Sequence, residues 1–173
     1  NDNTILDIDK NNNNDTTLTV NYQTKFGETT TKVSVGDNDV YITDVDNTSI
    51  HSALVKLTNT KVGDSLIVNG TLPNGIKDSL YTIGDTTYIA LKGKGTFVQY
   101  QNAIKLVNFK HSNAVIDSTT RVIFVTVNDS LVNSNVAIAT ITIENRSPLI
   151  VNDIYVTLED SVLTNTLADI LKN

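Results

Sequence analysis

The chain has 173 residues, a formal net charge of −6 and no cysteine. The acidic balance disfavours binding to nucleic acid, because the protein's own field repels phosphate, and the lack of cysteine excludes disulfides and thiolate metal sites. No run of about 18 or more apolar residues occurs, so the sequence predicts no membrane insertion by this fragment. The polarity comes mainly from Asn, Thr and Ser, which favour strands and turns over helices.

Alternating apolar residues predict a series of short, half-buried strands in the first part of the chain. The alternating positions are Leu18, Val20 and Tyr22; Val33 and Val35; Val40 and Ile42; Ala53, Val55 and Leu57; and Leu66 and Val68. Clusters of Gly and Asn between these segments supply the positive φ angles of tight turns. This part of the chain is therefore predicted to be a succession of strands and turns.

One segment departs from this pattern. In residues 96–106, the apolar residues Phe97, Tyr100 and Ile104 recur at helical spacing, which predicts a short helix that crosses from one sheet to another. After it, residues 121–128 and 135–144 are rich in β-branched residues and are joined by a polar stretch, which predicts a hairpin.

About ten short strands with turn signals every 8 to 12 residues or so predict an all-β fold, as a two-sheet sandwich or a small barrel. The composition changes at residues 145–149, where Pro148 blocks further strand pairing and a new alternating segment, 150–158, begins. We therefore predict a domain over residues 1–145. Residues 146–173 are predicted to be a linker and the start of a following repeat, or a C-terminal strand extension.

Acidic residues occur in pairs at the ends of predicted strands. The pairs Asp7 and Asp9, Asp37 and Asp39, and Asp44 and Asp46 each have one residue between them. In a loop that leaves a strand, such a pair can turn both carboxylates toward one Ca²⁺ ion, whereas unbound carboxylates that close would repel each other. Asp and Asn also simply mark turns, so each pair has a structural interpretation as well.

Asp7, Asp9 and Asn11 match the first, third and fifth ligand positions of an EF-hand loop. The match then fails, because Asn12 stands where the loop requires Gly and Leu18 stands where it requires a bidentate Glu. The sequence therefore disfavours an EF-hand but leaves a looser calcium loop possible.

No catalytic arrangement stands out, and the sequence predicts that the chain is not an enzyme. Its two histidines, His51 and His111, do not have a metal-ligand spacing, and both are predicted to be surface residues. No phosphate-binding Gly loop is present, and nothing marks one carboxylate as an acid and another as a nucleophile.

Taken together, several segments resemble the cadherin-like repeats of giant bacterial RTX-type adhesins. The segments that carry the resemblance are residues 42–46 (ITDVD), 52–59 (SALVKLTN), 72–76 (LPNGI), 100–104 (YQNAI) and 121–129 (RVIFVTVND). The resemblance covers about residues 1–145. It implies an Ig-like or cadherin-like β-sandwich in a secreted, extracellular cell-surface protein, strung in tandem with neighbouring repeats of the same chain and stiffened by Ca²⁺ near the domain junctions.

Matched position by position, the resemblance implies calcium ligands at Glu28, Asp44, Asp46 and Asp129. Two features depart from the family pattern. The acidic linker typical of cadherins is replaced by residues 144–148 (ENRSP), and Asp129 is followed by Ser130 where the repeats usually carry Gly.

The leading hypothesis from the sequence is an extender module that supports cell adhesion or biofilm formation. A second hypothesis is a module that binds a ligand, either a glycan or a protein on a host or other surface. The aromatic content of 6% with no Trp disfavours a sugar-stacking platform. A third is a structural domain of a surface layer. Any export signal or membrane anchor is expected elsewhere in a longer parent chain.

Overall fold

The computed structural model describes residues 2–14, 19–112 and 116–144. Within these residues the chain forms eleven strands and one helix. In chain order the elements are β1 (Ile5–Asp7), β2 (Tyr22–Gly27), β3 (Val33–Ser34), β4 (Tyr41–Thr43), β5 (Ser49–Leu57), β6 (Asp64–Val68), β7 (Lys77–Ile83), β8 (Thr86–Thr96), α1 (Phe97–Lys105), β9 (Val107–His111), β10 (Arg121–Asn128) and β11 (Ala137–Glu144).

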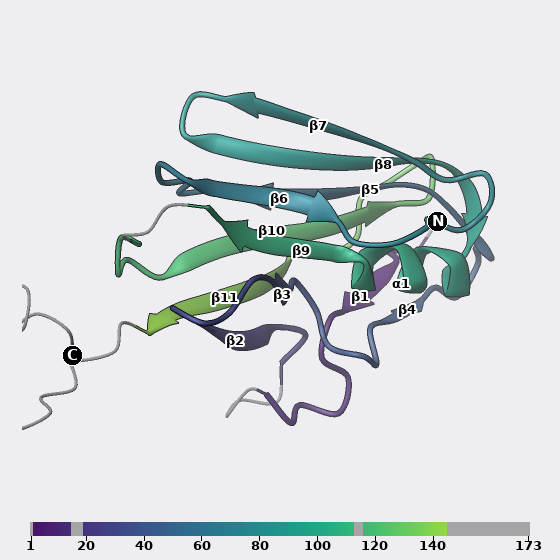
Figure 1. The fold of residues 1–173 in the computed structure, drawn as a ribbon. Coiled ribbons are helices and arrows are strands. Elements are labelled where there is room, and N and C mark those ends of the chain that lie inside the picture. Colours follow the sequence, from purple (N-terminus) through teal and green to yellow (C-terminus); the bar gives the residue numbers. More distant parts are fainter. Residues whose placement is uncertain (1, 15–18, 113–115, 145–173) are drawn as a thin grey trace, which may run out of the picture.

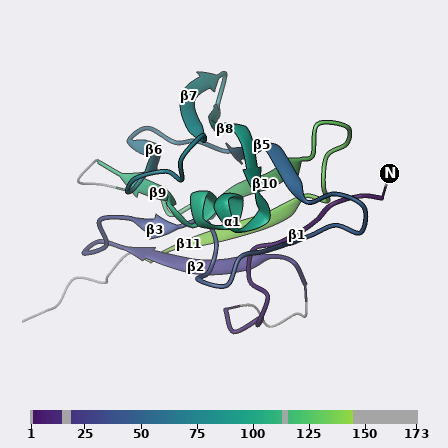
Figure 2. The same ribbon diagram turned by 90° about the vertical axis from the view of Figure 1, so that its right-hand side faces the viewer.

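The strands form a sandwich of two layers. A six-stranded sheet in the order β2-β11-β10-β5-β8-β7 makes one layer, and a three-stranded sheet in the order β3-β9-β6 packs against one of its faces (Figure 1). The pair β1-β4 continues the second layer beside α1 (Figure 2). The chain is therefore an all-β sandwich with one short helix, as its sequence predicts.

The predicted hairpin is confirmed in β10 and β11, which pair antiparallel from Arg121 opposite Ile141 to Val125 opposite Ala137. Side chains of β10 alternate strictly between buried and half-buried, because one face of the strand lies on the core and the other faces outward. β11 also pairs with β2 in parallel, so the closing strand of the hairpin ties the first long strand into the sheet.

The predicted helix is also confirmed, as α1. Thr96 caps it, since its hydroxyl accepts a hydrogen bond from the Gln99 amide while the Gln99 side chain accepts one from the Thr96 amide. Tyr100 and Ile104 are buried on the inner face of the helix. The helix links β8 of the larger sheet to β9 of the facing sheet, so it crosses between the layers as predicted.

β7 differs from the other long strands because all seven of its residues are exposed. It stands at the edge of the larger sheet, where β8 is its one strand neighbour among the described residues. A groove of about 550 Å³ opens beside it, lined by residues of β6 and β7 that include Leu66 and Leu80. No helix in the described part of the chain is long and apolar enough to cross a membrane. The predicted boundary at 145–149 and the segment 146–173 lie outside the described residues.

Candidate metal centre

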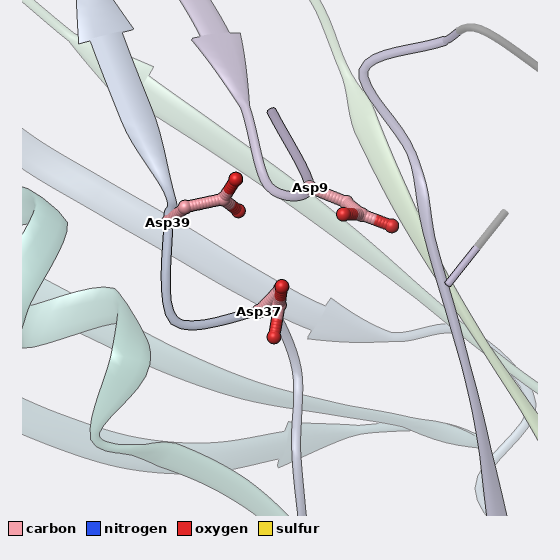
Figure 3. Close-up of side chains that lie close together, drawn as sticks. All are labelled: Asp9, Asp37 and Asp39. Atoms are coloured by element: carbon pink, nitrogen blue, oxygen red, sulfur yellow. The ribbon is translucent and has the colours of Figure 1, made fainter. Parts of the chain in front are cut away.

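Asp9, Asp37 and Asp39 form a cluster of carboxylates on one flank of the sandwich (Figure 3). Asp9 follows β1, while Asp37 and Asp39 lie in the connection between β3 and β4. Each carboxylate offers one oxygen such that all three oxygens lie within 4.8 Å of one another. The antiparallel pairing of β1 with β4 brings the two segments together, because Asp7 stands opposite Tyr41.

Backbone hydrogen bonds fix the positions of these carboxylates. The Asp37 amide donates to the Ile8 carbonyl at 2.8 Å. Asp39 accepts from the amides of Lys10 at 3.2 Å and Asn11 at 2.8 Å, one on each carboxylate oxygen. Each of the two segments thus donates backbone hydrogen bonds to the other, the loop after β1 and the β3–β4 connection. These bonds hold the three carboxylates in fixed relative positions.

Asp7 and Asn11, the other predicted ligands in this loop, are used in local turns. Asp7 Oδ1 accepts from the Asp9 amide at 3.0 Å, and Asn11 Oδ1 accepts from the Asn13 amide at 2.9 Å. Asn12 has a φ of 52°, the left-handed conformation that an EF-hand assigns to Gly. Of the three positions that match an EF-hand, the structure places only Asp9 in the cluster.

Asp9 is fully buried, and its two oxygens differ in their surroundings. Oδ2 accepts from the Asn14 amide at 3.2 Å. Oδ1 is buried and has no hydrogen-bond partner among the described residues. Burial raises the pKa of the Asp9 carboxyl, and the negative charges of Asp37 and Asp39 raise it further, whereas the backbone amides of Asn14 and Asn13 act to lower it. The fold thus leaves a desolvated acceptor beside two further carboxylates.

No cation of the described chain forms an ion pair with this cluster. Lys10, the adjacent cationic residue in sequence, places its Nζ over the Tyr41 ring, 3.4 Å from the centroid. A buried carboxylate without a cation costs considerable free energy, which a bound ion would remove.

The donor set fits a calcium ion. Ca²⁺ takes oxygen ligands at about 2.3–2.6 Å, so two oxygens on one ion lie at most about 5 Å apart. The 4.8 Å limit for the cluster satisfies this condition. Carboxylate oxygens are also the ligands that hard cations prefer. Asp9, Asp37 and Asp39 could therefore supply three ligands, with carbonyl oxygens and water completing the shell.

The predicted ligands Asp44, Asp46 and Asp129 lie together at the other end of β4. Asn47 contacts all three, through its side-chain amide and its backbone amide. The Asn47 Nδ2 donates to Asp129 Oδ2 at 2.8 Å and to Asp46 Oδ1 at 3.2 Å. Their carboxylate oxygens are largely engaged by the protein itself: Asp44 Oδ1 accepts from the amides of Asp46 and Asn47, and Asp129 Oδ1 accepts from those of Leu131 and Val132.

Asp44 illustrates how this second group differs from the first. Burial acts to raise its pKa, but hydrogen bonds from Thr4 and from the Asp46 and Asn47 amides outweigh burial and lower the pKa to about 2. Ser130, which stands where the repeats that the sequence resembles usually carry Gly, has a φ of 91°. The turn therefore keeps the backbone conformation that Gly would favour, and Asp129 keeps its place in it.

Glu28 lies apart from both groups. It directly follows β2, whose last residue, Gly27, stands opposite Glu144 at the end of β11. Asp129 lies at the opposite end of that sheet, in the turn between β10 and β11. The register puts it about eleven residues further along β10 than Glu144, which is about 36 Å at about 3.3 Å per residue. The structure does not bring Glu28 to the other three residues that the family resemblance implies.

A buried charge cluster of Asp64, His111 and Arg121 was missed by the sequence analysis. Asp64 Oδ2 accepts from Arg121 Nε at 2.5 Å, and Asp64 Oδ1 lies 2.9 Å from His111 Nδ1. The His111 side chain is 3% exposed, so its prediction as a surface residue is wrong. The physical reason is strand register, which places His111 of β9 opposite Asp64 of β6. His51, by contrast, is half-buried on β5.

Comparison with known proteins adds little. No protein-family model matches the chain, and no curated protein matches it. Among solved structures, it is similar to a non-cellulosomal cohesin from the hyperthermophilic archaeon Archaeoglobus fulgidus, with 12% identity and a TM-score of 0.36 over 83% of this chain and 92% of that chain. So weak a likeness supports no inference about function. The strand pairing itself defines the class, an all-β sandwich module.

Proposed function

We propose that the chain is a non-catalytic extender module of a secreted, repetitive bacterial surface adhesin, stiffened by Ca²⁺ bound at Asp9, Asp37 and Asp39. The observation that carries the proposal is the buried Oδ1 of Asp9, which has no partner among the described residues and faces two more carboxylates. The resemblance to cadherin-like repeats supports the adhesin context, with neighbouring repeats of the same chain as partners.

The position of the cluster suggests how the ion would act. Asp9 belongs to the N-terminal segment, and Asp37 and Asp39 belong to the β3–β4 connection. An ion shared by both would crosslink the first strand to the body of the sandwich. In a chain without cysteine, this metal-ion crosslink takes the place of a disulfide. It resists a force applied to the N-terminal segment, because the ligands of the ion must separate before β1 can leave β4.

The stability test compares the chain in millimolar calcium with the chain in EDTA. We expect a higher melting temperature in calcium, because an ion that binds only the folded state stabilises it by mass action. Magnesium at the same concentration should give a smaller increase, since it dehydrates reluctantly and demands stricter octahedral geometry. Identical melting curves in calcium and EDTA would contradict the proposal.

The mechanical test uses single-molecule pulling through the two ends of the chain. We expect a higher mean unfolding force in calcium than in EDTA, and a return to the lower force when EDTA replaces calcium. A calcium-dependent melting temperature without a calcium-dependent unfolding force would support the metal site but count against the extender role.

A further inference from the structure

The outer face of the six-stranded sheet carries a hollow of about 270 Å³. Its polar lining residues, which define what we call the outer-face hollow, are Ser52, Tyr81, Lys92, Thr126, Asn128 and Asn133. The hollow spans four adjacent strands, β7, β8, β5 and β10, and Asn133 of the loop after β10 lines one end of it. Small or aliphatic side chains, Leu54 and Ala90, line it between the polar groups.

Tyr81 gives the hollow an aromatic wall whose position is fixed. Its ring stacks on that of Tyr88, directly opposite on β8, with centroids 4.9 Å apart and an interplanar angle of 8°. Lys56 Nζ lies 5.9 Å from the Tyr88 centroid on the far side of the pair. Tyr81 itself is 41% exposed. An aromatic ring that is held in place and partly open offers an apolar surface with a hydroxyl at its edge, which suits a sugar ring.

The polar groups around the hollow are available to a ligand. The side chains of Ser52, Lys92 and Thr126 make no hydrogen bond or ion pair with described residues. Asn128 Nδ2 donates to Asn133 Oδ1 at 2.8 Å, which orients the Asn133 amide and leaves its Nδ2 for another acceptor. Hydroxyls, an amide and an ammonium around a small apolar floor match the mixed surface of a monosaccharide, and the volume is below the roughly 300–1,000 Å³ of drug-sized sites.

The charge at the hollow indicates that the ligand is an anion. Although the chain carries 19 acidic and 13 basic residues, no acidic residue lines the hollow. Lys92 is the one charged residue of the hollow's lining. Strand register places it directly opposite Lys77, which lies outside the hollow, and like charges in this arrangement are destabilising. Neither lysine forms an ion pair within the described residues, so a carboxylate bound to Lys92 in the hollow would weaken the repulsion.

We infer that the outer-face hollow binds a carboxylated monosaccharide unit. Its ring lies against Tyr81 and the apolar floor, its carboxylate pairs with Lys92, and its hydroxyls bond to Ser52, Thr126 and Asn133. This site does not depend on the cation cluster, since the two share no residue. It would make the module a ligand binder in addition to a spacer.

The test is an NMR titration of the isotope-labelled full chain in calcium buffer with the methyl glycosides of glucuronic acid, galacturonic acid and N-acetylneuraminic acid. At least one should shift the amide signals of Tyr81, Lys92 and Thr126. The neutral methyl glucoside and methyl galactoside should bind about tenfold or more weakly, because they lack the charge-assisted bond to Lys92. Sodium acetate at matched ionic strength should leave these signals unchanged.

Two substitutions sharpen the test. Tyr81→Ala should abolish the shifts, and Lys92→Gln should reduce the affinity for the acidic sugar to that for its neutral analogue. Lys110→Gln, which removes an exposed lysine from β9 in the facing sheet, is the matched control and should bind as the parent does. The inference is overturned if no acidic sugar shifts these signals, if neutral and acidic sugars bind equally, or if acetate alone reproduces the shifts.

Discussion

Asp9 and Asp64 are both buried carboxylates, yet the fold treats them differently. Asp64 receives the Arg121 guanidinium, the His111 ring and the Lys61 amide, so all its partners come from the chain. Among the described residues, Asp9 receives only backbone amides and no cation, and its neighbours Asp37 and Asp39 repel it. The difference teaches that burial alone does not mark a ligand site. A buried carboxylate whose charge the chain already balances is structural, while one left unbalanced is a candidate ligand for a cation from outside.

The largest expected effect comes from breaking the balanced cluster. Replacing Arg121 by Met should cost about 3–5 kcal/mol of unfolding free energy, because it leaves Asp64 buried without its cation. Urea denaturation measures the change, and calcium should not restore the loss. Lys25→Met, which removes an exposed ion pair with Glu144, is the control and should cause no resolvable change. A loss of unfolding free energy well below this range in Arg121→Met would show that Arg121 does not stabilise the buried Asp64 carboxylate.

The next effect concerns the unbalanced cluster. Asp9→Asn should remove the calcium-dependent part of the stability, which amounts to about 2.7 kcal/mol when calcium is at about 100 times its Kd. Calorimetric titration and denaturation in calcium measure it. Asp78→Asn, an exposed aspartate on β7, is the matched control and should keep full calcium dependence. Retention of calcium binding by the Asp9 variant would place the ion elsewhere.

A smaller effect should appear with pH in EDTA. Burial raises the pKa of Asp9 above its ordinary value of 3.8, so the folded chain holds this proton more tightly than the unfolded chain does. The contribution of Asp9 is therefore most favourable below the ordinary value and is lost as pH rises through the folded pKa. Denaturation between about pH 3 and 7 should show the parent losing stability relative to Asp9→Asn as pH rises.

Calcium should reverse this trend, because the ion binds the deprotonated carboxylate and its contribution grows with pH. A parent and variant with parallel pH profiles in EDTA would mean that Asp9 is not desolvated in solution.

The smallest effect is expected at Glu28. Glu28→Gln should leave the calcium affinity and the calcium-dependent melting temperature unchanged, because Glu28 lies at the opposite end of β11 from Asp129 and away from Asp9. Calorimetric titration checks this expectation. A clear loss of calcium binding would show that a second ion sits at the C-terminal end of the sandwich, as the family resemblance implies.

Much of the architecture could be predicted because it rests on local patterns. The alternation in residues 121–128 and 137–144 specifies two strands with one buried face, and the spacing of Tyr100 and Ile104 specifies a helix. The candidate ligands Asp9, Asp37 and Asp39 were also identifiable as acidic pairs. The burial of Arg121 could also have been predicted from alternation, since Arg121 lies on the same, inward-facing side of β10 as Ile123 and Val125.

The sequence alone specified a cysteine-free all-β fold, a sandwich or a small barrel, whose acidic pairs lie at strand ends, because strand periodicity and turn chemistry are encoded by neighbouring residues. Which carboxylates meet was decided only by the tertiary structure, since the pairing of β1 with β4 joins residues 34 to 38 positions apart in the sequence. Burial of Asp9, the pairing of His111 with Asp64 and the placement of Ser52 between Lys92 and Asn128 in the hollow likewise arise from register between strands distant in sequence. Neighbouring residues do not encode that register, because it depends on how the whole sheet closes over the core.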